Sequence, residues 1–279
     1  MAGPKPWYPA PPTLGVHLMS PASTTPIFAI ASGKGGVGKT SLTLNLATLL
    51  AKQGQRVLLL DGDTGLANLD VQLNVQPQKD LAHVLAGQAT LAEIALPIPQ
   101  LSTGKGSVTL LPGRAGHAGL TNVTQPQLTQ LLTDLRDLPI DATVVLIDVA
   151  AGVAPAQLIM CAQSTATVLV STPDPSSLTD AYALIKLLWQ QHGTANTRLL
   201  VNQASKTEGQ QVHTRLSTAA ENFLKLPPLP LLGIVPTDKL FSTAVRSQAI
   251  ATLTYPQSTA VEALEAVLPK LLIPSQKAA

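Results

Sequence analysis

Short apolar runs alternate with longer amphipathic segments along this chain from Pro26 onward. Most of the runs are continuously apolar, which is typical of strands that helices cover on both faces. Seven runs are predicted as strands: Ile27–Ala31, Val57–Asp61, Val108–Leu111, Val144–Asp148, Thr167–Val170, Leu199–Val201 and Leu231–Val235. The segments between them carry helical spacing and predict helices at Ser41–Lys52, Asp80–Ala86, Leu91–Ala95, Gln125–Asp137, Ala154–Cys161, Ser176–Gln191, Gln210–Phe223 and Asp238–Gln248.

This alternation of strand and helix predicts an α/β fold with a doubly wound, mostly parallel sheet. We expect one domain over residues 26–254, because the pattern continues without a linker. Residues 1–25 are predicted to form a disordered leader, since seven of the 23 prolines fall within the first 26 residues. Residues 255–279 are expected to form a C-terminal helix and tail.

The C-terminal helix, predicted at Ser258–Leu268, leaves two interpretations open. It could dock on a membrane surface or pack on the domain. A membrane-surface helix places Lys and Arg opposite a bulky apolar face. This segment instead carries Glu262 and Glu265 and ends near Pro269. The pattern therefore favours packing on the domain over peripheral membrane contact.

The composition of the chain excludes some classes of partner and cofactor and indicates a cellular compartment. The chain has 279 residues, 12% of them charged, and a formal net charge of +2. No dense Lys/Arg run occurs, so we expect no direct nucleic-acid partner. The single cysteine, Cys161, excludes intrachain disulfides and makes an iron–sulfur carrier improbable, because clusters need several thiolates. These features predict a cytoplasmic protein.

A phosphate-binding loop of the form G-x-x-x-x-G-K-T runs from Gly33 to Thr40, between a predicted strand and a predicted helix. Backbone N–H groups of such a loop surround phosphate oxygens at a helix N-terminus. We expect Lys39 to reach the β- and γ-phosphates of ATP and the Thr40 hydroxyl to bind Mg²⁺. The full set of nucleotide-contacting loop residues is predicted as Gly35, Gly36, Val37, Gly38, Lys39, Thr40 and Ser41.

Carboxylates follow two of the predicted strands. Asp61 ends one strand and Asp63 lies two residues later, while Asp148 ends another. Carboxyl ends of parallel strands open onto the ligand crevice. An apolar run that ends in Asp supports the Mg²⁺ shell beside a phosphate loop. We therefore predict Thr40, Asp61 and Asp148 as the Mg²⁺ site.

A second lysine in the loop, Lys34, makes this chain resemble the deviant Walker A ATPases of the MinD/ParA (SIMIBI) family of P-loop NTPases. The resemblance implies an ATP-dependent homodimer in which Lys34 touches the partner's phosphates. It also implies that Asp63 positions the attacking water, so that Lys34, Lys39 and Asp63 form the catalytic set. Three further positions resemble the adenine-contacting segments of the family: Asn202, Pro236 and Asp238.

Three stretches resemble the flagellar-number regulators within that family: Gly65–Asp70, Leu81–Gly87 and Ser177–Lys186. This resemblance implies an ATP-binding and hydrolysing dimerisation switch that regulates the number or placement of flagella. It implies slow, partner-stimulated turnover, and a flagellar GTPase or a transcriptional regulator as partner. It also allows peripheral placement at the inner membrane or a cell pole.

Two alternatives stay open. Val149 stands where the family usually places Thr or Ser, and the leader lacks the activator motif of the flagellar regulators. Both features favour a nucleotide-binding regulatory adaptor with little turnover. A MinD-like ATPase that positions a division site or cargo would use the same core.

Overall fold

The computed structural model describes residues 25–63, 68–113, 123–138, 140–193 and 196–273. The predicted leader lies outside the described residues apart from Thr25, as do residues 64–67 of the stretch after Asp63. The strands are β1 (Ile27–Ala31), β2 (Arg56–Gly62), β3 (Leu96–Pro97), β4 (Ser107–Leu111), β5 (Val144–Val149), β6 (Ala166–Ser171), β7 (Thr197–Val201) and β8 (Leu231–Ile234).

These strands form one sheet in the order β3-β4-β2-β5-β1-β6-β7-β8. Every pair is parallel except β3 with β4, which is antiparallel at the sheet edge. Strand β1 lies at the centre, between β5 and β6. The predicted doubly wound, mostly parallel sheet is therefore confirmed.

Helices connect the strands on both faces. Before β5 they are α1 (Lys39–Lys52), α2 (Leu69–Gln72), α3 (Leu81–Leu85), α4 (Leu91–Ile94), the 3₁₀ turn η1 (Pro99–Leu101) and α5 (Gln125–Arg136). After β5 they are α6 (Pro155–Ala162), α7 (Pro175–His192), α8 (Lys206–Ala219), the π-helical turn η2 (Ala220–Leu224), α9 (Lys239–Arg246), α10 (Ala251–Thr254), α11 (Thr259–Glu265) and α12 (Leu268–Leu272).

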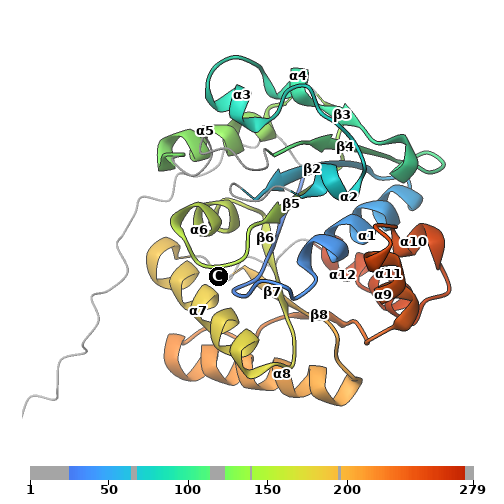
Figure 1. The fold of residues 1–279 in the computed structure, drawn as a ribbon. Coiled ribbons are helices and arrows are strands. Elements are labelled where there is room, and N and C mark those ends of the chain that lie inside the picture. Colours follow the sequence, from blue (N-terminus) through green and yellow to red (C-terminus); the bar gives the residue numbers. More distant parts are fainter. Residues whose placement is uncertain (1–24, 64–67, 114–122, 139, 194–195, 274–279) are drawn as a thin grey trace, which may run out of the picture.

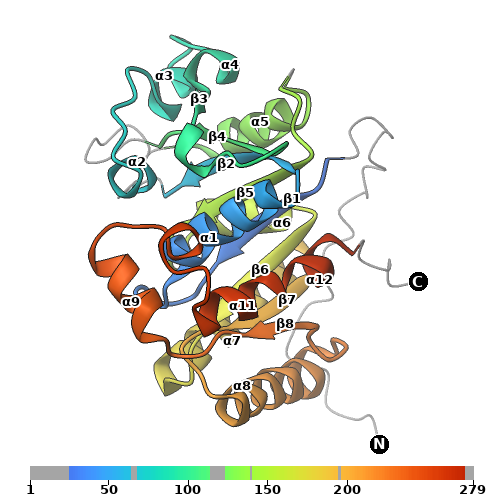
Figure 2. The same cartoon turned by 90° about the vertical axis from the view of Figure 1, so that its right-hand side faces the viewer.

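The sheet separates two apolar cores. One core packs the buried faces of α5, α6, α7 and α8 against it, and the other packs α1, α11 and α12 against the opposite face. Figure 1 shows the first set of helices on the left and below the sheet and the second on the right, and Figure 2 turns the second set toward the viewer. Because both faces are covered, the central strands are apolar at successive positions, as the sequence indicated.

The C-terminal helices pack on the domain. Val261, Leu264, Leu268 and Leu271 are all at most 1% exposed and belong to the core on the α1 side. The buried Arg198 of β7 donates hydrogen bonds to the backbone oxygens of Lys270, Leu271 and Ile273, which caps the end of α12. The apolar face of this region is therefore engaged with protein. Within the described residues, no helix has the length and apolar character needed to cross a membrane.

Most predicted elements are confirmed, with corrections at several boundaries. Helix α8 begins at Lys206, four residues before the predicted start, and the helix predicted at Ser258–Leu268 ends at Glu265. Pro269 lies in the first turn of the separate helix α12, where a proline is tolerated. The sequence did not indicate four short elements, β3, α2, η1 and α10.

Candidate nucleotide-binding site

The glycine-rich loop lies between β1 and α1 and requires two left-handed residues. Gly36 has φ +79° and Gly38 has φ +87°, a backbone region that side chains rarely adopt. The side-chain amide of Asn202, which follows β7, donates to the Val37 carbonyl at 2.8 Å. A Cβ on Gly38 would lie 2.5 Å from that amide nitrogen, so a glycine is needed there for space as well. Asn202 thus fixes the loop from the neighbouring strand.

Two further contacts hold the start of the loop. A Cβ on Gly33 would lie 2.2 Å from the backbone oxygen of Asp180, so the loop and α7 approach closely only because Gly33 has no side chain. The backbone N–H of Gly152, in the turn after β5, donates to the Ser32 carbonyl at 2.9 Å. The start of the loop therefore lies close against α7 and is bonded to the turn after β5.

Lys39 and Asp148 form a buried ion pair. The Lys39 ammonium lies 2.9 Å from Asp148 Oδ1, and the side chains are only 8% and 3% exposed. The Thr43 hydroxyl lies 3.2 Å from the same oxygen. Lys39 is therefore held at the end of β5, in a desolvated setting where a second anion can compete with the carboxylate for it.

Asp61 lies directly beside Asp148, because these residues are register partners on β2 and β5. Its carboxylate accepts hydrogen bonds from the backbone N–H groups of Asp63, Asn68 and Leu69 at 3.0–3.2 Å. Burial, together with the neighbouring charge of Asp148, raises the pKa of Asp61 to about 7, although hydrogen bonds from the backbone of Leu69 and Asp63 oppose the shift. Two neighbouring, buried carboxylates thus lie side by side at the strand ends.

Asp63 follows β2 and is half-buried. Its backbone N–H binds Asp61 Oδ1 at 3.2 Å, which joins the segment after β2 to the carboxylate pair. The role of its side chain in orienting water stays a prediction. Residues 64–67, which follow Asp63 and include the start of the stretch Gly65–Asp70, lie outside the described residues.

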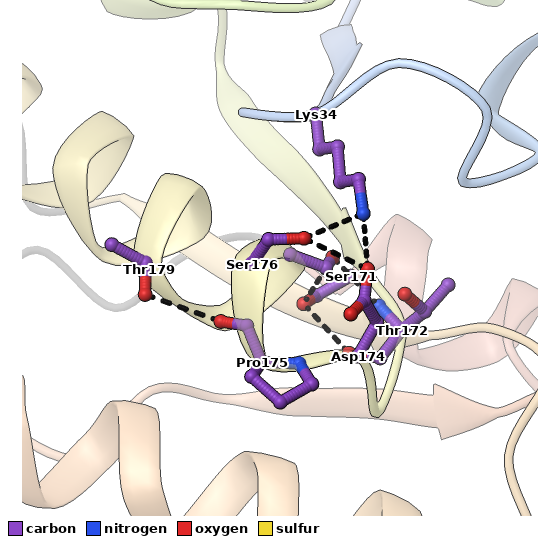
Figure 3. A network of polar contacts seen from close by, with 8 residues as sticks. Lys34, Ser171, Thr172, Asp174, Pro175, Ser176 and Thr179 are labelled. Atoms are coloured by element: carbon purple, nitrogen blue, oxygen red, sulfur yellow. Dashed lines mark hydrogen bonds and ion pairs between the residues drawn. The ribbon is translucent and has the colours of Figure 1, made fainter.

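Lys34 points away from the phosphate-binding loop toward the start of α7 (Figure 3). Its ammonium forms an ion pair with Asp174 and lies 2.5 Å from the Ser176 hydroxyl. The side chains of the pair are 37% and 45% exposed. Hydrogen bonds from Lys34 and then from Ser176 hold the pKa of Asp174 below its usual range. Because the pair is exposed to solvent, it contributes little to stability.

The segment expected to contact adenine lies after β8. Pro236 is half-buried, and Asp238 is the N-cap of α9, accepting from the Phe241 N–H at 2.9 Å and the Thr259 hydroxyl at 2.8 Å. Burial opposes ionisation of Asp238, but these hydrogen bonds outweigh it and lower its pKa to about 2. Asp238 therefore anchors α9 to α11. Base contacts by Asn202, Pro236 and Asp238 stay predictions.

The residues predicted to hold Mg²⁺ are chemically suited to this ion. Thr40, Asp61 and Asp148 supply hard oxygen atoms, which this ion prefers, and the two adjacent carboxylates place negative charge where a cation would relieve it. Among the described residues, no group of three or more His, Cys, Asp or Glu side chains could hold a metal ion. In phosphate-binding sites, Mg²⁺ is held by one or two carboxylates together with substrate phosphates and water.

The raised pKa of Asp61 predicts that the nucleotide-free protein loses stability as pH rises from about 4 to 7. The unfolded carboxyl releases its proton near 3.8, whereas the folded one retains it until about 7. Between these values the folded state binds more protons, so the free energy of unfolding falls by up to about 1.4 kcal/mol per pH unit. Denaturant unfolding at pH 5 and pH 8, without Mg²⁺, measures this. Asp61→Asn should flatten the dependence, and equal losses in both proteins would contradict the assignment.

Sequence reasoning brought together the main residues of this site and missed several that support it. The structure pairs Lys39 with Asp148 and places Asp61 beside Asp148 at the ends of β2 and β5, while their contacts with phosphate and Mg²⁺ stay predictions. Thr43 was missed, because a threonine inside an amphipathic helix gives no signal of its own. Asp174 and Ser176, the partners of Lys34, were missed as well, although Asp174-Pro175 is a recognisable helix start.

Known proteins resemble this chain along most of its length. A family model described as the CobQ/CobB/MinD/ParA nucleotide binding domain matches residues 28–250. The antiactivator FleN of Pseudomonas aeruginosa is 36% identical over 246 residues, which cover 88% of this chain and 85% of FleN. The flagellum site-determining protein YlxH of Helicobacter pylori is 34% identical over 227 residues, covering 81% and 74%.

A solved structure shares the fold. The septum site-determining protein MinD of Pyrococcus horikoshii OT3, complexed with Mg-ADP, superposes with a TM-score of 0.71 at 25% identity. The match covers 89% of this chain and 96% of that one.

The central β1–loop–α1 unit with two lysines, followed by carboxylates on the adjacent strands, defines a nucleotide-binding protein of the P-loop class. The chain belongs to the MinD/ParA family of nucleotide-binding domains. The resemblance seen in the sequence is thereby confirmed.

Proposed function

We propose that this chain is an ATP-binding and hydrolysing dimerisation switch that regulates the number or placement of flagella. One observation carries the proposal. The loop holds two lysines with different surroundings: Lys39 is buried against Asp148, and Lys34 lies at the outer edge of the loop with an exposed partner. The side chain of a lysine so placed can release Asp174 and bind the phosphates held by a second copy of the chain.

ATP with Mg²⁺ is the ligand we assign to the site. Backbone N–H groups of the glycine-rich loop and the Lys39 ammonium would bind the phosphates, and Lys39 would exchange Asp148 for the triphosphate. Thr40, Asp61 and Asp148 would hold Mg²⁺. The ion would neutralise charge on the β- and γ-phosphate oxygens during transfer.

Pairing would depend on the γ-phosphate. A ligand shifts an equilibrium only through a differential contact with the two states. Lys34 supplies such a contact when it crosses to the partner's triphosphate, and the exposed Lys34–Asp174 pair opposes this exchange only weakly. Asp63 would orient the attacking water, so hydrolysis would remove the γ-phosphate and release the pair.

The flagellar role rests on the two relatives. FleN is named an antiactivator and YlxH a flagellum site-determining protein. A transcriptional regulator or a flagellar GTPase is therefore the partner we propose, in the cytoplasm or at the cell pole. Peripheral contact with the inner membrane would need a segment other than α12, since Leu268 and Leu271 are buried in the core.

Mass in solution tests the switch. Light scattering of the purified chain with Mg²⁺ should give a dimer with a non-hydrolysable ATP analogue and a monomer with ADP.

Deleting the gene in its flagellated host should change the number or position of flagella per cell. An identical mass with both nucleotides would overturn the switch, and unchanged flagella would overturn the flagellar role.

A regulatory adaptor with little turnover is the second candidate. It is favoured by Val149, which is fully buried beside Asp148 and has no hydroxyl to offer the site. Phosphate release, measured with and without candidate flagellar partners, separates the two candidates. Release that a partner stimulates supports the switch, and none above background supports the adaptor.

A MinD-like role in division-site or cargo positioning is the third candidate. The MinD structure that shares the fold is its support. Misplaced septa with normal flagella in the deletion strain would favour this candidate.

A further inference from the structure

The Asp148 carboxylate has two donors on one oxygen, and only one of them can stay when nucleotide binds. Lys39 Nζ lies 2.9 Å from Oδ1 and the Thr43 hydroxyl lies 3.2 Å from the same atom. In the proposed function, on which this inference rests, Lys39 leaves for the phosphates. Asp148 then loses its ammonium while it remains inside the protein, where an unpaired carboxylate is strongly disfavoured.

Thr43 is placed to remain. It lies in α1 one turn after Lys39, is fully buried, and its hydroxyl also lies 3.0 Å from the Lys39 carbonyl oxygen. The two acceptors share one hydroxyl proton. Its backbone belongs to the helix that follows the loop, so the hydroxyl keeps its place when the Lys39 side chain moves.

We propose that Thr43 is the positioning residue of Asp148, keeping this carboxylate oriented toward the Mg²⁺ site after Lys39 has moved to the phosphates. Oδ1 then stays with the threonine, and the carboxylate's rotation about its terminal bond is restricted. The residue after Asp148 cannot do this, because Val149 carries no hydroxyl. The hydroxyl that the strand lacks is thus supplied from α1.

This chain offers a matched control on the same helix. Thr48 is also fully buried, and its hydroxyl makes the same type of bond to a carbonyl one turn earlier, to Leu44 at 2.8 Å. Among the hydrogen bonds of the described residues, that of Thr48 reaches no carboxylate. Thr43→Val and Thr48→Val therefore remove the same group from the same kind of helical position, and only the first removes a donor from Asp148.

The experiment titrates a fluorescent ADP analogue into the full chain, once with Mg²⁺ and once with EDTA. We expect Thr43→Val to weaken binding about 10-fold with Mg²⁺ and little with EDTA, as for loss of one hydrogen bond to a charged group. Thr43→Ser should restore the Mg²⁺ effect, and Thr48→Val should behave like wild type. Thermal unfolding without nucleotide identifies a variant that fails to fold.

Three results would overturn the inference. If Thr43→Val weakened nucleotide binding equally in Mg²⁺ and in EDTA, the variant would be damaged in general. Unchanged binding would show that Thr43 is not needed to position Asp148. Equal effects of Thr43→Val and Thr48→Val would assign the loss to helix packing. Wild-type binding that does not depend on Mg²⁺ would instead contradict the proposed function itself, which separates the two failures.

Discussion

Replacing Asp63 by alanine is expected to lower ATP turnover by about 100-fold or more while leaving the ATP-dependent dimer intact. A carboxylate that orients water or accepts its proton contributes 10²–10⁴-fold in comparable sites. The lysines and the loop that we propose as the triphosphate-binding groups are unchanged, so ATP should hold the two copies together longer than in wild type. Phosphate release and light scattering with ATP and Mg²⁺ measure the two effects.

A surface carboxylate provides the control for Asp63. Asp134 of α5 is exposed and bonds to Gln130 on its own helix, away from the strand ends. Asp134→Ala should therefore retain wild-type turnover. If Asp63→Ala hydrolyses ATP as fast as Asp134→Ala, Asp63 does not orient the attacking water.

Replacing Lys34 by alanine is expected to abolish pairing at micromolar protein while ATP binding persists. Removing one partner of a buried charge pair at an interface costs about 2 kcal/mol or more, and a two-fold dimer loses two such pairs. The loss of about 4 kcal/mol weakens dimerisation about 1000-fold. Binding to the single chain should survive, because Lys34 points away from its own loop (Figure 3). Light scattering and a nucleotide titration measure both properties.

Asp174→Asn is the matched control for Lys34. It removes the same exposed ion pair and keeps the ammonium group. We expect this variant to dimerise with ATP within a few-fold of wild type, since exposed ion pairs are weak. Loss of the dimer in both variants would mean that the ion pair itself, and not a lysine that crosses the interface, supports pairing.

The sequence predicted the sheet and its ligand edge well because the burial signal is strong there. Seven runs, most of them continuously apolar, predict strands, and each of them is a strand in the structure. The first residues of helices that begin with polar residues were harder to predict. Helix α8 opens with Lys206-Thr207-Glu208-Gly209, which carries no apolar spacing, although Ser205 and Glu208 form a capping box that announces its start.

At the site, the sequence could not predict contacts between residues that are far apart along the chain. The residue types at the loop and at the ends of β2 and β5 predicted phosphate and Mg²⁺ chemistry. The pairing of Lys34 with Asp174 joins residues 140 positions apart, which no local pattern indicates. Similarly, the sequence suggested Asn202 for adenine, whereas the structure adds a bond to the Val37 carbonyl that only the tertiary arrangement could reveal.

Mixing two inactive variants tests most directly whether Lys34 acts on a neighbouring copy. Lys34→Ala in excess over Asp63→Ala should release phosphate well above the sum of the separate proteins. The reason is that each mixed dimer holds one complete site, with Asp63 from one protomer and Lys34 from the other. No recovery, in a mixture whose mass shows that mixed dimers form, would contradict the account.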